Sequence, residues 1–343
     1  MTRPLFAALL GLLGSLFAGC TPSGFVANQF LRAPKSFPKV VAPQPRVYFS
    51  FPDQVTDTLP EQLATVGDPP LTLAYRLVPP GDYGARMVLT NHQAYGKSWP
   101  LYWFPAHPAT NALPKRGTVV FLHGYGLEHG TLIPWALQAA GHGWNGVAVD
   151  LRGHGNSDGT RITFGIQEAH DLTDLIDELS RRGQASWPVQ VVGVSYGAAV
   201  ALRWASQESR VERVVAITPY DHLADAIEGL RRSYASWLPA GLIQRAAEKL
   251  PERVGQPPGG LDPLNWLGQH PVTALFIAAG SDPVAPPEAI QRLAACSPSS
   301  RIINLEETTH EMAPFRIDQL AQPVLDWLDT PLPQVGQAVS GKR

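Results

Sequence analysis

Short strand-like runs alternate with helical stretches from residue 117 to residue 328, and this alternation constrains the fold more than any other feature. In the helical stretches, such as 166–179, apolar residues recur at spacings of three and four. The strand-like runs are TVVFLHG (118–124), GVAVDL (146–151), VQVVGV (189–194), VERVVAIT (211–218), VTALFIAAG (272–280) and RIINLEE (301–307). Most of these runs are continuously apolar, which is typical of strands buried on both faces. The pattern predicts an α/β fold with a doubly wound, mostly parallel sheet.

Two regions depart from this alternation. The β-rich segments 71–78, 85–93 and 99–106 are separated by Pro and Gly turns, and they predict an antiparallel start to a sheet of about eight strands. Residues from about 220 to 270 interrupt the strand rhythm and carry helical periodicity instead. We expect this stretch to form a helical cap inserted between two core strands.

The N-terminus has the pattern of a targeting segment. The apolar run LFAALLGLLGSLF (5–17) follows a single charge, Arg3, and is too short to span a bilayer. It ends in LFAGC, which resembles the lipobox of bacterial lipoproteins. The resemblance implies a signal peptide over 1–19, cleavage before Cys20 and a diacylglycerol on its sulfur. Thr21 then implies the periplasmic face of the outer membrane in a Gram-negative cell. The alternative is an ordinary signal peptide cleaved nearby.

Composition sets the remaining boundaries and excludes several kinds of partner. Residues 20–46 are rich in proline and predict a flexible tether, residues 47–330 a folded body, and residues 331–343 a disordered tail. Cys20 and Cys296 are the only cysteines, so a lipidated Cys20 excludes a disulfide and a cysteine metal site. The net charge of −2 argues against a nucleic-acid partner. We expect no cofactor and no metal.

The pattern G-x-S-x-G occurs twice, at 155–159 and at 193–197. A nucleophile elbow requires a buried strand directly before the serine and a helix directly after it. Ser195 has both, because VQVVGV precedes it and a helical stretch follows. Ser157 lies in the loop RGHGNSDGT, with no helix start behind it. The context therefore favours Ser195 as a nucleophile and Ser157 as a loop residue.

Five segments in order now resemble the α/β-hydrolase superfamily: FLHGYG, DLRGHGNSDG, GVSYGAA, AAGSDPVAP and ETTHEMAPF. The resemblance covers roughly residues 70–328 and implies the α/β-hydrolase fold. It also implies catalytic residues in the chain order Ser, acid, His. A serine needs an adjacent base, and His310, in the loop after the last strand, is where the superfamily carries its catalytic histidine.

The acid that would orient this histidine has two candidates. Asp282 follows the strand-like run 272–280, at a strand end where ligand chemistry gathers in parallel sheets, and its loop GSDPVAP matches the superfamily. Asp221 follows the preceding strand and is the rival, because some relatives place the acid there. We favour Asp282.

The resemblance further implies an oxyanion hole made of two backbone amides. One is the amide of Tyr196, directly after the nucleophile, and the other is that of Tyr125 in HGYG. His123 in the same loop is structural in this superfamily, which leaves it outside the catalytic set.

These residues predict a serine hydrolase that cleaves a carboxylic ester through an acyl-enzyme. A lipid anchor and an apolar cap suit a lipid-like ester such as a lysophospholipid or a monoacylglycerol. Two alternatives stay open. The same triad serves acyltransferases and amide or thioester hydrolases, and the fold alone would serve a non-catalytic binding lipoprotein of the cell envelope.

Overall fold

The computed structural model describes residues 21–36, 59–81, 83, 85–87, 90–91, 97–98, 101–103, 113 and 116–330. The predicted signal peptide (1–19), Cys20 and the predicted tail (331–343) lie outside the described residues. No helix in the described part of the chain combines the length and the apolar character needed to cross a membrane.

An eight-stranded sheet forms the centre of the molecule and has the order β1-β2-β8-β7-β9-β10-β11-β12. Its strands are β1 (Glu61–Val66), β2 (Leu71–Val78), β7 (Gly117–Leu122), β8 (Trp144–Val149), β9 (Val189–Val194), β10 (Val211–Ile217), β11 (Ala274–Ser281) and β12 (Arg301–Thr309). β2 is antiparallel to β1 and β8, and from β8 to β12 every pair is parallel. The predicted mostly parallel sheet of about eight strands is confirmed.

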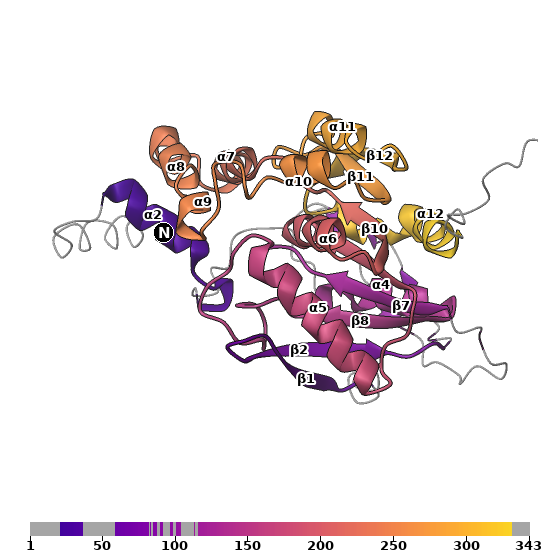
Figure 1. Ribbon diagram of the computed structural model, residues 1–343. Helices are drawn as coiled ribbons and strands as arrows, with labels where there is room; N and C mark the ends of the chain where they lie inside the picture. The colour runs from indigo at the N-terminus through magenta and orange to yellow at the C-terminus, as the bar shows by residue number, and fades with distance from the viewer. Residues whose placement is uncertain are drawn as a thin grey trace, which may run out of the picture.

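Helices cover both faces of the sheet (Figure 1). α5 (Ile166–Arg181), α6 (Tyr196–Gln207) and α11 (Pro287–Ala295) pack into one apolar core. α4 (Ile133–Gly141) and α12 (Ile317–Asp329) pack into the other. The continuous apolar runs follow from this arrangement, because a strand between two cores buries both of its faces.

The cap predicted between two core strands is present between β10 and β11. It consists of α7 (Leu223–Tyr234), α8 (Ala240–Ala247), α9 (Leu250–Arg253) and α10 (Pro263–Gln269). Figure 1 shows α7, α8 and α9 extending beyond the sheet, on the side of the molecule where α2 lies.

The flexible tether predicted for 20–46 is wrong over its described part. Residues Pro22–Leu31 form helix α2, followed by a short 3-10 turn at Pro34–Ser36. Thr21 caps α2 by accepting a hydrogen bond from Gly24 N at 3.2 Å, and Pro22 occupies the first turn, where no amide hydrogen is needed. Ala27 and Leu31 are fully buried. Proline therefore starts this helix instead of preventing it.

The first strands differ in part from their prediction. The segment 71–78 is β2, but β1 was not predicted, because EQLATV lacks the alternation of a typical strand. In the segments 85–93 and 99–106, the strands that the structure describes form small two-stranded ladders and are not paired with the large sheet. In these, β3 (Ala85–Met87) pairs with β6 (Leu101–Trp103), and β4 (Thr90–Asn91) pairs with β5 (Lys97–Ser98).

Candidate active site

Ser195 lies in the tight turn between β9 and α6. Its backbone has φ 52° and ψ −113°, a conformation that side-chain-bearing residues rarely adopt and that is typical of strained functional positions. The two glycines of the pattern make this turn possible. A Cβ on Gly193 would overlap the carbonyl of Gly197, and a Cβ on Gly197 would overlap the carbonyl oxygens of Leu122 and His123.

Gly197→Ala is therefore expected to destabilise the protein by about 1–3 kcal/mol, because the end of β7 must move to admit one methyl group. Gly141→Ala is the matched control. Gly141 ends α4 with open space around it, so the change should be neutral or stabilising by up to about 1 kcal/mol. Urea unfolding of both variants measures the difference, and equal midpoints would contradict the close approach seen at Gly197.

The structure brings Ser195, His310 and Asp282 together at the carboxyl ends of three different strands. Ser195 Oγ is 2.8 Å from His310 Nε2, and His310 Nδ1 is 2.7 Å from Asp282 Oδ2. His310 directly follows β12 and Asp282 directly follows β11. All three side chains have the geometry of a nucleophile, a base and an orienting acid.

Asp282 is held by more than the histidine. Its Oδ1 accepts hydrogen bonds of 2.8 Å from the amides of Val284 and Ala285, which leaves Oδ2 for His310. The rival acid, Asp221, faces elsewhere: its Oδ2 is 2.6 Å from Arg292 Nε and its Oδ1 accepts from the amide of His222. In this structure Asp282, and not Asp221, contacts His310.

The loop after β7 lies directly beside the serine. A Cβ on Gly124 would stand 3.8 Å from Ser195 Cβ, and a turn closes from Leu127 N to Gly124 O at 3.1 Å. Tyr125 is in this turn, and Tyr196 is the first residue of α6, where helix amides have no partner within the helix. His123 is fully buried and accepts a hydrogen bond from Leu151 N at 3.0 Å, which fits a structural role.

Comparisons with known proteins agree with this fold. A family model described as serine aminopeptidase, S33, matches residues 114–254. An esterase from Pyrococcus furiosus superposes with a TM-score of 0.58 at 19% identity, over 83% of this chain and 96% of its own. An enol-lactonase from Burkholderia xenovorans gives 0.51 at 19% identity, over 78% of this chain and 100% of its own. The chain has the α/β-hydrolase fold. No curated protein matches it.

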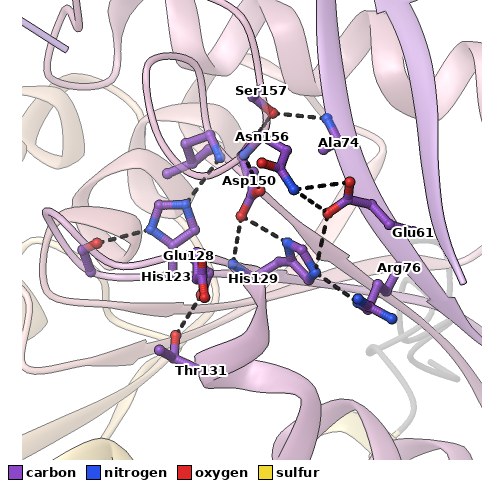
Figure 2. Close-up of polar contacts among 12 residues, drawn as sticks. Glu61, Ala74, Arg76, His123, Glu128, His129, Thr131, Asp150, Asn156 and Ser157 are labelled. Atoms are coloured by element: carbon purple, nitrogen blue, oxygen red, sulfur yellow. Dashed lines mark hydrogen bonds and ion pairs between the residues drawn. The ribbon is translucent and has the colours of Figure 1, made fainter. Parts of the chain in front are cut away.

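A polar network connects the loop after β7 with the loop after β8 (Figure 2). Asp150, directly after β8, accepts hydrogen bonds from the amides of His129 at 2.6 Å and Asn156 at 2.8 Å. Burial alone would raise the pKa of the Asp150 carboxyl, but hydrogen bonds and charge from His129 lower this pKa to about 2. The sequence analysis assigned no role to His129 or Asp150. The position of Asp150 at the end of a buried strand could have indicated a functional or structural role.

Ser157, the serine of the second G-x-S-x-G pattern, belongs to this network. It is fully buried, its Oγ donates to Asp150 O at 2.5 Å, and it accepts from Ala74 N at 2.8 Å. Its hydroxyl thus donates one hydrogen bond and accepts another, which stabilises the loop after β8. Because Ser157 is buried, it is not exposed to substrate.

Glu61, His129 and Asp150 also place their ligand atoms within 4.8 Å of one another, as a metal site would. However, Arg76 Nε donates to His129 Nε2 at 2.8 Å, so a guanidinium already occupies the histidine nitrogen that faces Glu61. A metal ion would have to displace that cation. The cluster fits a structural network better than a metal centre.

His154 is expected to make the stability of the folded protein sensitive to acid. Burial, with the nearby His123, lowers the pKa of His154 to about 3, and its Nε2 has no hydrogen-bond partner among the described residues. The unfolded chain protonates this histidine near pH 6.5, so stability falls as the pH drops below that value and continues to fall to about pH 3.

Between about pH 7.5 and pH 5, His154 is expected to remove about 2 kcal/mol of stability. His154→Gln should therefore flatten the pH dependence of the unfolding free energy by that amount. His170→Gln, at an exposed position on α5, should leave it unchanged. Urea unfolding at both pH values is the measurement, and equal slopes in wild type and His154→Gln would contradict the burial of a neutral imidazole.

A cavity of about 260 Å³ opens above Ser195. Its walls are mostly apolar and aromatic side chains from α2, α6, α7, α8 and the loops beside them, among them Phe30, Leu238 and, in the loop after β7, Tyr125. Among the described lining residues, Arg231 is the charged one. Its guanidinium donates hydrogen bonds to the Glu228 carboxylate and to the carbonyls of Ser236 and Leu238. The space in contact with the serine therefore suits an uncharged, apolar group.

Proposed function

We propose that this protein, which has the α/β-hydrolase fold, is a serine esterase that cleaves carboxylic esters through Ser195, His310 and Asp282. The observation that carries the proposal is the unbroken chain of contacts from Ser195 Oγ to His310 and on to Asp282, at 2.8 and 2.7 Å. The esterases among the structurally similar proteins support the same reaction class.

In the proposed mechanism, His310 Nε2 accepts the Ser195 proton while Oγ attacks the ester carbonyl. Asp282 keeps the other proton of the ring on Nδ1 and stabilises the imidazolium that forms. His310 then donates its new proton to the departing alkoxide, which leaves an acyl-enzyme. A water molecule deprotonated by His310 attacks this intermediate, and the acid departs as Ser195 regains its proton.

The amides of Tyr125 and Tyr196 are proposed as the oxyanion hole. Tyr196 N begins α6, where the helix dipole favours negative charge, and Tyr125 follows Gly124, which lies against Ser195. Donors fixed in this way stabilise the charge that develops on the carbonyl oxygen and need no rearrangement during the reaction.

The proposed substrate is an ester whose acyl part is apolar, with monoacylglycerols and lysophospholipids as the lipid-like class. The support is the apolar lining of the cavity at Ser195. An aminopeptidase, as the matched family is described, would need a carboxylate to bind the substrate ammonium group. Among the described residues the cavity lining holds no carboxylate, which favours the ester.

The proposed site of action is the bacterial cell envelope, with Cys20 as the lipidated residue and the outer membrane as the location in a Gram-negative cell. The support is the sequence LFAGC after an apolar run. Mass spectrometry of the mature N-terminal peptide tests the anchor: a diacylglycerol on Cys20 is the expected result, and an unmodified Cys20 would contradict it.

Hydrolysis of p-nitrophenyl esters from acetate to palmitate, together with labelling by a fluorophosphonate probe, tests the esterase activity. Wild type should turn over at least part of the series and be labelled, and Ser195→Ala should do neither. If wild type neither hydrolyses any of these esters nor is labelled by the probe, the esterase proposal is refuted and a non-catalytic binding lipoprotein is favoured. Transfer of the acyl group to an added alcohol in preference to water would identify an acyltransferase.

A further inference from the structure

We propose that helix α2 is the specificity-determining wall of the cavity and that Phe30 sets the length of the acyl group it accepts. This inference rests on the proposed esterase function. Phe30 is the residue through which α2 reaches the cavity above Ser195, where it lines the same space as Leu238 and Ile243 of the cap. α2 also lies outside residues 114–254, so the matched family model does not include this wall.

The cap holds the first part of α2 by polar contacts. Lys249 Nζ donates to Thr21 Oγ1 and to Ser23 Oγ, both at 3.0 Å, and Arg253 donates to Asn28 Oδ1 at 2.6 Å. Figure 1 shows α2 (indigo) beside α8 and α9 (orange), far from it in the sequence. These contacts hold α2 against α8 and α9, and Ile243 of α8 lines the cavity.

The other end of α2 is held by the backbone of the loop after β8. Leu31 O accepts from Ile162 N and Ala33 N donates to Thr160 O, both at 2.9 Å. Leu31 itself is fully buried. The backbone of α2 is therefore held on both sides of Phe30, by the cap and by the loop after β8. We infer that the Phe30 ring is a rigid boundary of the cavity.

A rigid apolar boundary selects substrates by size. Shortening the side chain at position 30 lengthens the space available to an acyl chain, and a pocket that gains room for methylene groups improves on longer substrates by about tenfold or more. The cavity of about 260 Å³ is small for a ligand pocket, so a single ring is a large part of its wall.

The test is kcat/KM across p-nitrophenyl esters of increasing acyl length, measured on the full-length protein. Phe30→Ala should shift the optimum to longer chains and raise the long-to-short ratio about tenfold, and Phe30→Trp should shift it to shorter chains. Phe25→Ala is the matched control, because Phe25 lies on the same helix, is half-buried and does not line the cavity.

If Phe30→Ala and Phe25→Ala both keep the wild-type optimum, the inference is overturned while the esterase stands. If wild type shows no Ser195-dependent turnover, the esterase proposal fails first, and a second measurement still tests the wall. Thermal shifts with straight-chain 1-alkanols should then show that Phe30→Ala is best stabilised by a longer alcohol than wild type and Phe25→Ala. An unchanged alkanol preference would refute the role of Phe30.

Discussion

Ser195→Ala is expected to lower kcat on an activated ester by roughly 10⁴- to 10⁶-fold and to leave the fold intact. The hydroxyl that contacts His310 Nε2 at 2.8 Å is the attacking group in the proposed mechanism. A methyl group at this position fits wherever the serine did. Steady-state kinetics on p-nitrophenyl butyrate and circular dichroism of the same samples measure the two quantities.

Ser157→Ala is the control, because Ser157 is the central serine of the other G-x-S-x-G match, at residues 155–159. Its loss leaves the amide of Ala74 without its acceptor in a buried position, which should cost about 1–3 kcal/mol of stability. The kcat of the folded variant should stay within about threefold of wild type, since no reacting atom is removed. The assignment is wrong if the folded Ser157→Ala protein loses turnover and Ser195→Ala keeps it.

Asp282→Asn is expected to lower kcat by about 10⁴-fold. The amides of Val284 and Ala285 donate to one oxygen of residue 282, so an asparagine would turn its own oxygen toward them and its NH₂ group toward His310. That NH₂ group cannot accept the Nδ1 proton. The ring would then carry its proton on Nε2, where it cannot take the proton of Ser195.

Asp221→Asn provides the comparison for this effect. It weakens the contact with Arg292, whose side chain is half-exposed, so a small loss of stability and a kcat within about threefold of wild type are expected. Kinetics of the two variants under the same conditions decide between the acids. A large loss confined to Asp221→Asn would show that Asp221 orients the histidine.

The sheet could be predicted because strands buried on both faces have continuous apolar sequences, as in VQVVGV before Ser195. The position of Asp282 could be predicted for a related reason, whereas His310 was predicted from the resemblance of its loop to the superfamily. In a parallel sheet all carboxyl ends meet at one edge, so residues that directly follow strands come together even when they are far apart in the chain.

Helix α2 could not be predicted in this way. The prolines of residues 21–46 suggested a tether. The contacts that decide the structure of α2 come from Lys249, Arg253 and Ile162, which no local pattern connects to residues 22–31. The same limit applies to Phe30 and to the pairing of His129 with Asp150. Each depends on residues brought together by the finished fold, and the sequence shows only one side of each contact.

The early start of α2 determines how far from a membrane the proposed esterase would meet its substrate. Pro22 is two positions after Cys20, and about 20 Å of chain at most separates Cys20 from Phe30. A lipid on Cys20 would therefore hold the cavity within that distance of the bilayer surface. The search for substrate would then be two-dimensional, confined to the leaflet that carries the anchor, and local lipid density would govern turnover more than bulk concentration does.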